Sequence, residues 1–353
     1  MPPQVPSNIR TLKPYVPGDQ PTQKRLIKLN SNENPYPPSE QAMRALRSLE
    51  PELLRTYPDP LAGAFRTAAA DLYGLKPENV VCTNGSDELL ALAARTFAAP
   101  GDVLATCVPT FAMYPVIAQI YGLKYHAVPW PEDWSLPVEA LLKARPKLIF
   151  VPNPGAPTTQ FTPVEVLDDL AKRFDGLLLI DEAYVEFADD HCLRLLESHD
   201  NVLITRTVSK AYSLAGLRFG YGLGQTGVID ELLKVKEIYN VDAAAQAVAT
   251  AALLDQEWAQ RVWQQVKQER QRMQDELRAV GFVMPDSQAN FLWASVPGGD
   301  GRGMFEHLRE QGILVRYFDH ADTADKLRIT VGTPQENNAL LAAVKQMFAE
   351  TAS

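Results

Sequence analysis

The chain has 353 residues, with 34 Lys and Arg against 43 Asp and Glu, and therefore a formal net charge of −9. This length is compatible with about two domains. Hydrophobic residues make up 46% of the chain and charged residues 22%, which is typical of a globular protein and excludes wholesale disorder. The acidic balance argues against nucleic acid as the main partner, because binding to phosphate backbones depends on clustered Lys and Arg.

The cysteines, the histidines and one uncharged segment bear on the cellular compartment of the protein and on whether it binds a metal or a membrane. The cysteines are odd in number and widely spaced, at Cys82, Cys107 and Cys192, which predicts reduced thiols in a cytoplasmic protein. The histidines form no HExxH or CxxC…H pattern, so we expect no metal site. Residues 103–123 carry no charge and are long enough to span a bilayer, but Pro109 and Pro115 divide them. We interpret this segment as a buried strand, a turn and a helix, and expect no membrane association.

The predicted elements begin with an arm and continue as alternating strands and helices. Residues 1–38 are rich in Pro and Asn, which predicts an extended arm that joins the smaller domain. Helical periodicity begins near Ser39, returns over Leu61–Tyr73 and recurs over Val164–Phe174. Several strand candidates between them are apolar on successive residues, which predicts burial on both faces of a mostly parallel sheet. These candidates are Val80–Thr83, Val103–Cys107, Lys147–Pro152, Leu177–Asp181, Val202–Thr205 and Phe219–Leu223.

The last hundred residues have a different pattern. A long amphipathic helix is predicted from Gln256 to Val280, ended by Gly281. The final helix opens with a capping box at Thr333–Glu336 with Pro334 in its first position. Between them we expect strands at Phe291–Val296, Ile313–Phe318 and Lys326–Val331 and a helix at Gly303–Gln311. The chain is therefore predicted to be an α/β protein, with a large domain over residues 39–255 and a smaller α+β domain over residues 256–353.

Three groups of polar residues follow predicted strands, where ligands of parallel α/β sheets bind. In Asn84–Glu88, Gly85 gives a tight turn, Ser86 and Asp87 are good N-caps, and the free N–H groups of the helix start can hold a phosphate. A plain capped helix is the alternative. Asp181 directly follows a buried strand and Tyr184 lies three residues on, so both can face a ligand; a solvent-facing loop acid is the alternative.

The third group, Thr207–Arg218, contains a lysine in unusual surroundings. Most lysines are surface residues, but Lys210 follows a strand and sits among small and apolar residues. Such surroundings lower a lysine pKa from about 10.4 toward that of a reactive amine. Ser209 and Arg218 add groups that bind phosphate. A lysine for a Schiff base, an acid for a pyridinium nitrogen and a phosphate site are together what pyridoxal phosphate requires.

With these residues the chain resembles the pyridoxal-phosphate aminotransferases of fold type I, and within them the histidinol-phosphate aminotransferases, over almost its whole length. The motifs that carry the resemblance are Leu29–Tyr36, Tyr57–Pro60, Asn84–Glu88, Pro109–Tyr114, Asp181–Tyr184, Ser209–Ala211, Gly216–Arg218 and Leu327–Thr333. The resemblance implies that Lys210 holds the cofactor, that Asp181 pairs with the pyridinium nitrogen and that Tyr184 bonds the ring's phenolic oxygen. Phe111 would stack on the ring.

The resemblance also implies a phosphate site, a substrate site and a homodimer. The cofactor phosphate would be surrounded by Gly85, Ser86, Asp87, Ser209 and Arg218, with Tyr57 reaching it from the neighbouring subunit. Arg328 would bind the anionic group of the substrate. Arg316 and Tyr15 resemble residues that bind the substrate phosphate, and Asn34 is assigned to the same substrate site.

The loop under the ring departs from the family. Relatives usually read Asn-Pro-Thr-Gly there, and that asparagine bonds the phenolic oxygen. Here the loop reads Asn153-Pro154-Gly155-Ala156-Pro157-Thr158-Thr159, with Ala156 in the asparagine position and Thr159 in the glycine position. Asn153 is assigned to the cofactor site, and either Asn153 or a water is expected to replace the lost amide.

The resemblance implies a cytoplasmic aminotransferase of histidine biosynthesis. It would convert L-histidinol phosphate and 2-oxoglutarate to imidazole acetol phosphate and L-glutamate. An aminotransferase for aromatic amino acids and a decarboxylase of phosphorylated threonine remain alternatives on similar scaffolds. A binding or regulatory protein with a degenerate cofactor fold is disfavoured, because Lys210, Asp181 and Arg218 are all present.

Overall fold

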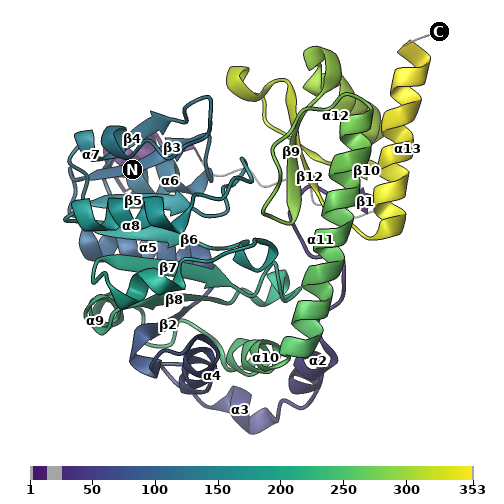
Figure 1. The fold of residues 1–353 in the computed structure, drawn as a ribbon. Helices are drawn as coiled ribbons and strands as arrows, with labels where there is room; N and C mark the ends of the chain where they lie inside the picture. Colours follow the sequence, from purple (N-terminus) through teal and green to yellow (C-terminus); the bar gives the residue numbers. More distant parts are fainter. Residues whose placement is uncertain (1–2, 14–25, 352–353) are drawn as a thin grey trace.

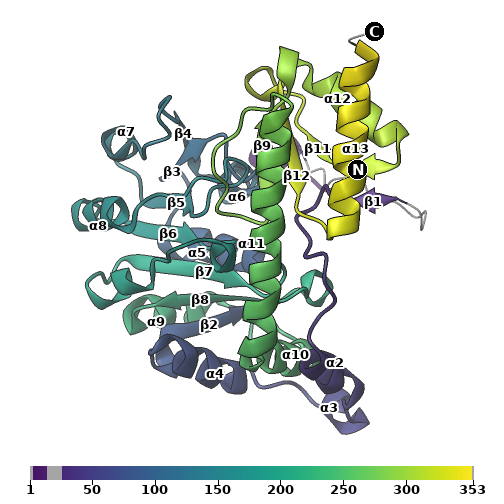
Figure 2. The ribbon, with the colours of Figure 1, turned by 45° about the vertical axis from the view of Figure 1, so that its right-hand side comes forward.

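The computed structural model describes residues 3–13 and 26–351. A larger α/β part is built around a seven-stranded sheet, and a smaller part packs beside it (Figure 1). The long helix α11 (Gln256–Ala279) runs along both parts (Figure 2). Within the described residues, no helix has the length and apolarity needed to cross a membrane.

The large sheet has the strand order β2-β8-β7-β6-β5-β3-β4 and is mostly parallel, with only β8 antiparallel to its neighbours. Six of its strands match the predicted ones within two residues at either end. The seventh, β4, lies at the edge and was missed, because most of its side chains are partly exposed and no apolar run marks it. The strands are β2 Val80–Thr83, β3 Val103–Val108, β4 Lys124–Pro129, β5 Leu148–Pro152, β6 Leu177–Asp181, β7 Val202–Thr207 and β8 Gly220–Gly224.

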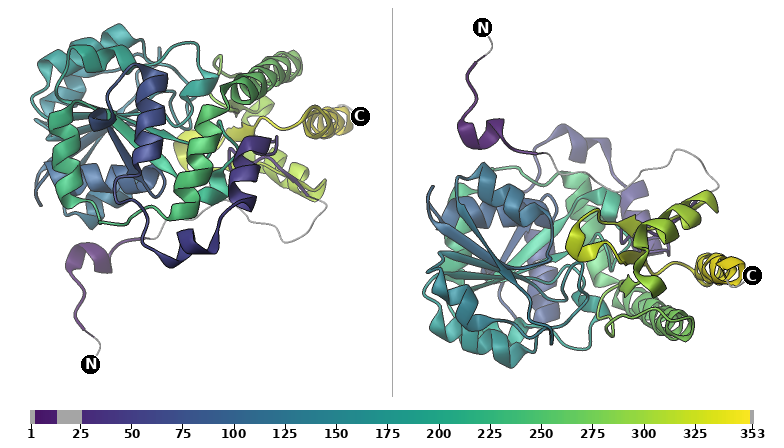
Figure 3. Two further views of the ribbon diagram at one scale, coloured as in Figure 1. Left: turned by 90° about the horizontal axis from the view of Figure 1, so that it is seen from below. Right: turned by 90° about the horizontal axis from the view of Figure 1, so that it is seen from above.

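Helices cover both faces of this sheet, as seen from below and above in Figure 3. Successive residues of β6 alternate between two apolar cores: Leu178 and Ile180 belong to one, Leu177 and Leu179 to the other. The predicted burial of the strands on both faces is therefore confirmed. The helices are α2 Glu40–Arg47, α3 Pro51–Arg55, α4 Gly63–Tyr73, α5 Ser86–Phe97, α6 Met113–Ile120, α7 Val138–Lys143, α8 Val164–Arg173, α9 Thr226–Val235 and α10 Ala243–Leu254.

The smaller part is built on a three-stranded antiparallel sheet in the order β11-β12-β9. The predicted strand 313–318 is in fact two short strands, because β10 pairs with β1 (Ile27–Lys28) from the arm while β11 pairs with β12. The predicted capping box is confirmed: Thr333 N–H donates to Glu336 Oε2 at 2.8 Å, and Glu336 N–H donates to Thr333 Oγ1 at 3.3 Å. The elements are β9 Phe291–Ser295, α12 Gly301–Glu310, β10 Ile313–Leu314, β11 Arg316–Tyr317, β12 Lys326–Thr330 and α13 Pro334–Thr351.

The arm is only partly extended. Its strand β1 (Ile27–Lys28) runs parallel to β10 and so attaches to the smaller part. Its first residues instead form a short helix, α1 (Ser7–Arg10), that lies on α6 of the larger part. Asn8 Nδ2 donates to the backbone oxygen of Gln119 there, at 3.0 Å. The predicted domain boundaries at residues 38 and 255 stay predictions.

Candidate active site

A cavity of about 140 Å³ opens at the carboxyl ends of the central strands. Residues from the ends of β5, β6 and β7 and from the start of α5 line it, so all three polar groups of the sequence meet here. Its polar lining residues are Ser86, Asp87, Asp181, Tyr184, Thr207, Ser209, Lys210 and Arg218, and Phe111 and Ala156 are among the others.

Lys210 lies in the loop that follows β7, with its side chain in the cavity wall. Its Nζ donates to the backbone oxygen of Ser31 at 3.1 Å. Burial, followed by the positive charge of Arg328, lowers the pKa of Lys210 to about 8. The lowered pKa that the sequence predicts for this amine is therefore confirmed.

Asp181 ends β6 and is almost completely buried. Tyr114 Oη donates to Asp181 Oδ2 at 2.9 Å, and Ala183 N–H donates to Oδ1 at 3.2 Å. Burial nevertheless raises the pKa of Asp181 to about 6. A carboxylate held in this way favours a cationic partner, because a positive charge beside it would offset the lost hydration. Tyr114, which belongs to one of the motifs, had no predicted role and is the direct support of this carboxylate.

The N-terminus of α5 forms the other end of the cavity. Gly85, at φ +78°, is its N-cap, and no side chain caps the helix. Ser86 and Asp87 are therefore the first helical residues rather than the predicted caps, and the first turn presents its N–H groups to the cavity. Arg218 lies alongside, with Nη2 3.5 Å from Asp87 Oδ2.

Two glycines make this cradle possible. A Cβ on Gly85 would lie 2.6 Å from Arg218 Nη2, and one on Gly220 would lie 2.4 Å from the backbone nitrogen of Ser86. Backbone N–H groups, an arginine and the hydroxyl of Ser209 thus line this end of the cavity, and a side chain at Gly85 would displace the Arg218 guanidinium. This donor set, without a neutralising acid other than Asp87, fits a phosphate group.

A second cavity of about 310 Å³ adjoins the first and shares Phe111, Ala156 and Tyr184 with it. Its cations are Lys13, Arg316 and Arg328. The two arginines are paired residues on neighbouring strands, because Arg316 of β11 lies opposite Arg328 of β12. Lys13 was not predicted; it belongs to the arm and follows α1, which packs on α6.

Tyr184 stands in the wall between the two cavities. Its ring meets Phe291 edge-on at 5.0 Å between centroids. Asn32 Nδ2 donates to Tyr184 Oη at 3.0 Å. Asn32 is also absent from the predicted site residues, although it belongs to the motif Leu29–Tyr36. Its contact with Tyr184 spans 152 positions of the sequence, so only the fold reveals it.

Two predicted site residues do not line either cavity. Asn153 is fully buried, with its amide donating to the backbone oxygen of Thr162 at 3.1 Å and to Cys192 Sγ at 3.5 Å. It does not line the first cavity, and its assignment to the cofactor site stays a prediction. Asn34 donates to the backbone oxygen of Lys210 at 3.1 Å and accepts from Tyr36 N–H, so it braces the lysine loop. Its assignment to the substrate site stays a prediction.

Tyr57 lies elsewhere, and Tyr15 cannot be placed. Tyr57 is 79% exposed, away from both cavities, and stacks on Tyr239 with ring centroids 4.5 Å apart. Tyr15 lies outside the described residues. All other predicted residues, from Ser86 to Arg328, meet at the two cavities, and Gly85 stands directly behind the first of them as the N-cap of α5.

The chain is similar to proteins of known class over nearly its full length. The family model of aminotransferase class I and II matches residues 24–344. The chain is 43% identical to histidinol-phosphate aminotransferase 1 of Nostoc sp., with 97% of both chains covered. It is 41% identical to the histidinol-phosphate aminotransferase of Rhodopirellula baltica, with 95% of this chain and 93% of the relative covered.

Solved structures give the same answer for the fold. The crystal structure of histidinol-phosphate aminotransferase from Sinorhizobium meliloti in complex with pyridoxal-5'-phosphate superimposes with a TM-score of 0.89, at 26% identity and 98% coverage of both chains. The predicted fold type I architecture, with a mostly parallel sheet and a smaller α+β part, is confirmed. The chain belongs to the aminotransferase class I and II family.

Proposed function

We propose that this protein is a pyridoxal-phosphate-dependent histidinol-phosphate aminotransferase of histidine biosynthesis, working in the cytoplasm with 2-oxoglutarate as amino acceptor. One observation carries the proposal: a cavity with Lys210, Asp181 and an open helix N-terminus adjoins a second cavity that holds three cations. The first arrangement suits the cofactor. The second suits a substrate that carries a phosphate and, alternately, one that carries two carboxylates.

The chain's own residues divide the work between them. Lys210 would hold the cofactor, and its amine would move the proton from the substrate carbon. Asp181, supported by Tyr114, would pair with the ring nitrogen and favour its protonated form. The start of α5, Ser209 and Arg218 bind the cofactor phosphate. When bound, pyridoxal phosphate supplies the electron sink that this chemistry requires.

The substrate end is assigned to the arginines. Arg328 binds the anionic group common to both substrates, because its planar fork matches carboxylate and phosphate geometry. Arg316, opposite it on β11, contributes to the binding of the phosphate of histidinol phosphate. Lys13 adds a third positive charge to the same cavity.

The protein is proposed to be a homodimer with a composite site. Leu54, Tyr57 and Ile238 are exposed apolar side chains, and Tyr57 and Tyr239 stack on each other at the surface. Exposed apolar groups gathered in this way are typical of an interface. In the dimer Tyr57 would reach the cofactor phosphate of the neighbouring subunit.

The test is a steady-state comparison of histidinol phosphate, phenylalanine and tyrosine as amino donors, with 2-oxoglutarate as acceptor. We expect the highest kcat/KM for histidinol phosphate, and a higher value for an aromatic amino acid would contradict the proposal. Single-turnover spectra separate the reaction classes. Transamination leaves pyridoxamine phosphate, whereas a decarboxylase of phosphorylated threonine regenerates the aldehyde.

A further inference from the structure

The contact between Asn32 and Tyr184 joins the arm to the wall between the two cavities. Asn32 is 1% exposed and adopts the left-handed conformation, at φ +55°, that asparagine tolerates better than most residues. Its backbone is fixed from the smaller part, since Asn290 Nδ2 donates to the oxygen of Asn32 at 3.0 Å. The side chain is therefore presented to Tyr184 by a rigid frame.

Thr330 determines which end of the Asn32 amide faces Tyr184. Asn32 N–H donates to Thr330 Oγ1 at 3.0 Å, so the single hydroxyl hydrogen of Thr330 is left to donate to Asn32 Oδ1 at 3.2 Å. The oxygen of the amide thus faces Thr330, and the NH₂ group faces Tyr184 at 3.0 Å. Because this NH₂ group can only donate, the Tyr184 oxygen accepts there and its own hydrogen points elsewhere.

The orientation of the Tyr184 hydroxyl matters because of the side chains in the loop 153–159. Ala156 occupies the family's asparagine position, lines both cavities beside Tyr184 and has no hydrogen-bonding side chain. The amide of Asn153, the nearest asparagine in the loop, is committed to Thr162 and Cys192. The loop therefore supplies no side-chain amide to this end of the cavity.

We propose that Asn32 is a positioning residue of the reaction, which fixes the Tyr184 hydroxyl as a hydrogen donor toward the bound cofactor where the loop amide is lost. The inference rests on the proposed function, because the oxygen that receives this hydrogen is the phenolic oxygen of pyridoxal phosphate. Asn32 acts on that oxygen only through Tyr184.

The test is a spectrophotometric pH titration of the cofactor bound at Lys210. The phenolic oxygen is most negatively charged when the nitrogen joined to Lys210 has lost its proton. A hydrogen donor to this oxygen therefore stabilises the deprotonated state and keeps the pH of the titration midpoint low. We expect Asn32→Ala to raise the midpoint by about half to one pH unit, and Tyr184→Phe to raise it more. Asn32→Asp should raise it at least as much as Asn32→Ala, because a carboxylate accepts the Tyr184 hydrogen instead of donating to its oxygen.

A double mutant separates positioning from mere stability. If Asn32 acts through the Tyr184 hydroxyl, Asn32→Ala has no further effect on the midpoint once Tyr184→Phe is present. Asn290→Ala is the matched control, since it removes a bond to the backbone of Asn32 and leaves the Asn32 amide in place. We expect it to lower the melting temperature and to move the midpoint less than Asn32→Ala does.

Each remaining outcome has one meaning. An unmoved midpoint in Asn32→Ala, or equal shifts with and without Tyr184→Phe, would overturn the inference. Should Asn32→Ala fail to fold, Thr330→Val replaces it, because that variant keeps Asn32 and removes the hydroxyl that orients its amide. An unmoved midpoint there would equally reject the proposal. A wild-type protein whose spectrum does not change when pyridoxal phosphate is added would contradict the proposed function instead.

Discussion

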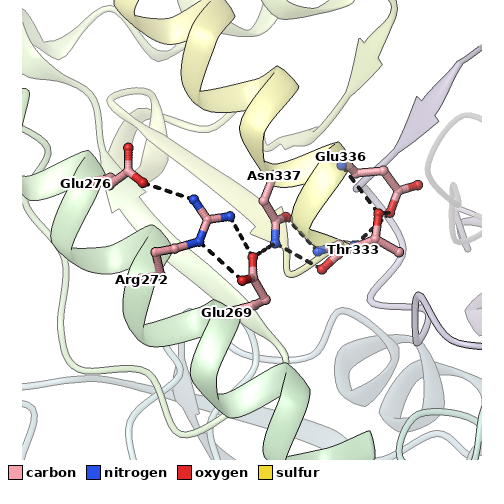
Figure 4. Close-up of polar contacts among 7 residues, drawn as sticks. Glu269, Arg272, Glu276, Thr333, Glu336 and Asn337 are labelled. Carbon is pink, nitrogen blue, oxygen red and sulfur yellow. Dashed lines mark hydrogen bonds and ion pairs between the residues drawn. The ribbon is translucent and has the colours of Figure 1, made fainter.

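Two polar clusters of this molecule shift the pKa values of their charged groups in opposite senses: one favours the charged forms and the other opposes them. The first lies where α11 meets α13 in the smaller part (Figure 4). There Arg272 Nη2 is 2.7 Å from Glu269 Oε2 and Arg272 Nη1 is 2.9 Å from Glu276 Oε1. Asn337 Nδ2 donates to Glu269 Oε2 and to the backbone oxygen of Gly332, each at 2.9 Å. The Arg272 guanidinium lowers the pKa of Glu269, so the folded chain favours the charged form.

The second cluster is the cavity that holds Asp181 and Lys210. Burial raises the pKa of Asp181 to about 6 and lowers that of Lys210 to about 8. The fold thus disfavours the charged form of both groups. Each unit of pKa shift corresponds to about 1.4 kcal/mol of free energy between the two protonation states. The comparison teaches that α11 and α13 are joined by charges that stabilise the fold, whereas the cavity holds charges that a bound ligand must compensate.

The largest expected effect comes from removing the cavity lysine. Lys210→Ala should abolish transamination, because the attachment of the cofactor and the proton shuttle both depend on this amine. Steady-state assays with histidinol phosphate measure the loss. The bound-cofactor absorbance that depends on the lysine should disappear as well, and normal turnover would refute the assignment.

The same variant should change the stability of the ligand-free protein in the opposite direction. The folded pKa of Lys210, about 8, lies below its unfolded value of 10.5, so unfolding takes up a proton between these two pH values. The free energy of unfolding of the wild type therefore rises with pH over this window, and below about pH 8 the full penalty is present. Lys210→Ala should be more stable at pH 7 by about 1–3 kcal/mol and should lack the rise. Thermal melts at pH 7 to 10.5 test both statements.

The arginines of the second cavity sharpen the comparison at the substrate end. Arg328→Lys should lower kcat/KM about 10–100-fold for histidinol phosphate and for 2-oxoglutarate alike, because lysine cannot reproduce a bidentate fork. Arg316→Ala should produce a loss of that size for histidinol phosphate and a smaller one for phenylalanine. Equal losses for both donors would show that Arg316 does not contact the phosphate.

Breaking the structural cluster should affect stability and leave the cavity unaffected. Asn337 is fully buried, and Asn337→Ala removes its bonds to Glu269 and to Gly332. We expect a loss of about 2–3 kcal/mol in the free energy of unfolding, measured by denaturant titration, with an unchanged cofactor titration. Lys345→Ala is the matched control: its pair with Glu276 is exposed, so the loss should stay below about 1 kcal/mol.

Sequence reasoning recovered the fold where burial leaves a simple pattern. Strand β6 is apolar on successive residues because it is buried on both faces, so both its limits were predicted correctly. The edge strand β4 has no such run and was missed. The prediction merged the short strands β10 and β11 into one, because the pattern of hydrophobic residues does not show where the chain changes its pairing partner.

For the site, the residues that directly follow strands were predictable, and their supports were not. Asp181 and Lys210 stand at strand ends, which is where ligands of such sheets bind. Tyr114 and Asn32 act on side chains 67 and 152 positions away, and no local pattern indicates such contacts. Asn153 and Asn34 have residue types that suit a site, but backbone groups use their amides first.

The smallest expected effect concerns the loop 153–159, where the chain carries Thr159 at the position for which the resemblance predicts glycine. Thr159 is fully buried at φ +63°, a conformation that costs a β-branched residue about 1–2 kcal/mol. Its backbone is held there by Thr159 N–H donating to Gly155 at 2.9 Å and by Gln288 N–H donating to Thr159 at 3.1 Å. Thr159→Gly and Thr159→Ala both delete the hydroxyl and the methyl group, but only glycine relieves the backbone. The glycine variant should therefore be more stable than the alanine variant by about 1 kcal/mol in denaturant titration. Equal stabilities would mean that this loop, unlike the charged groups above it, stores no strain.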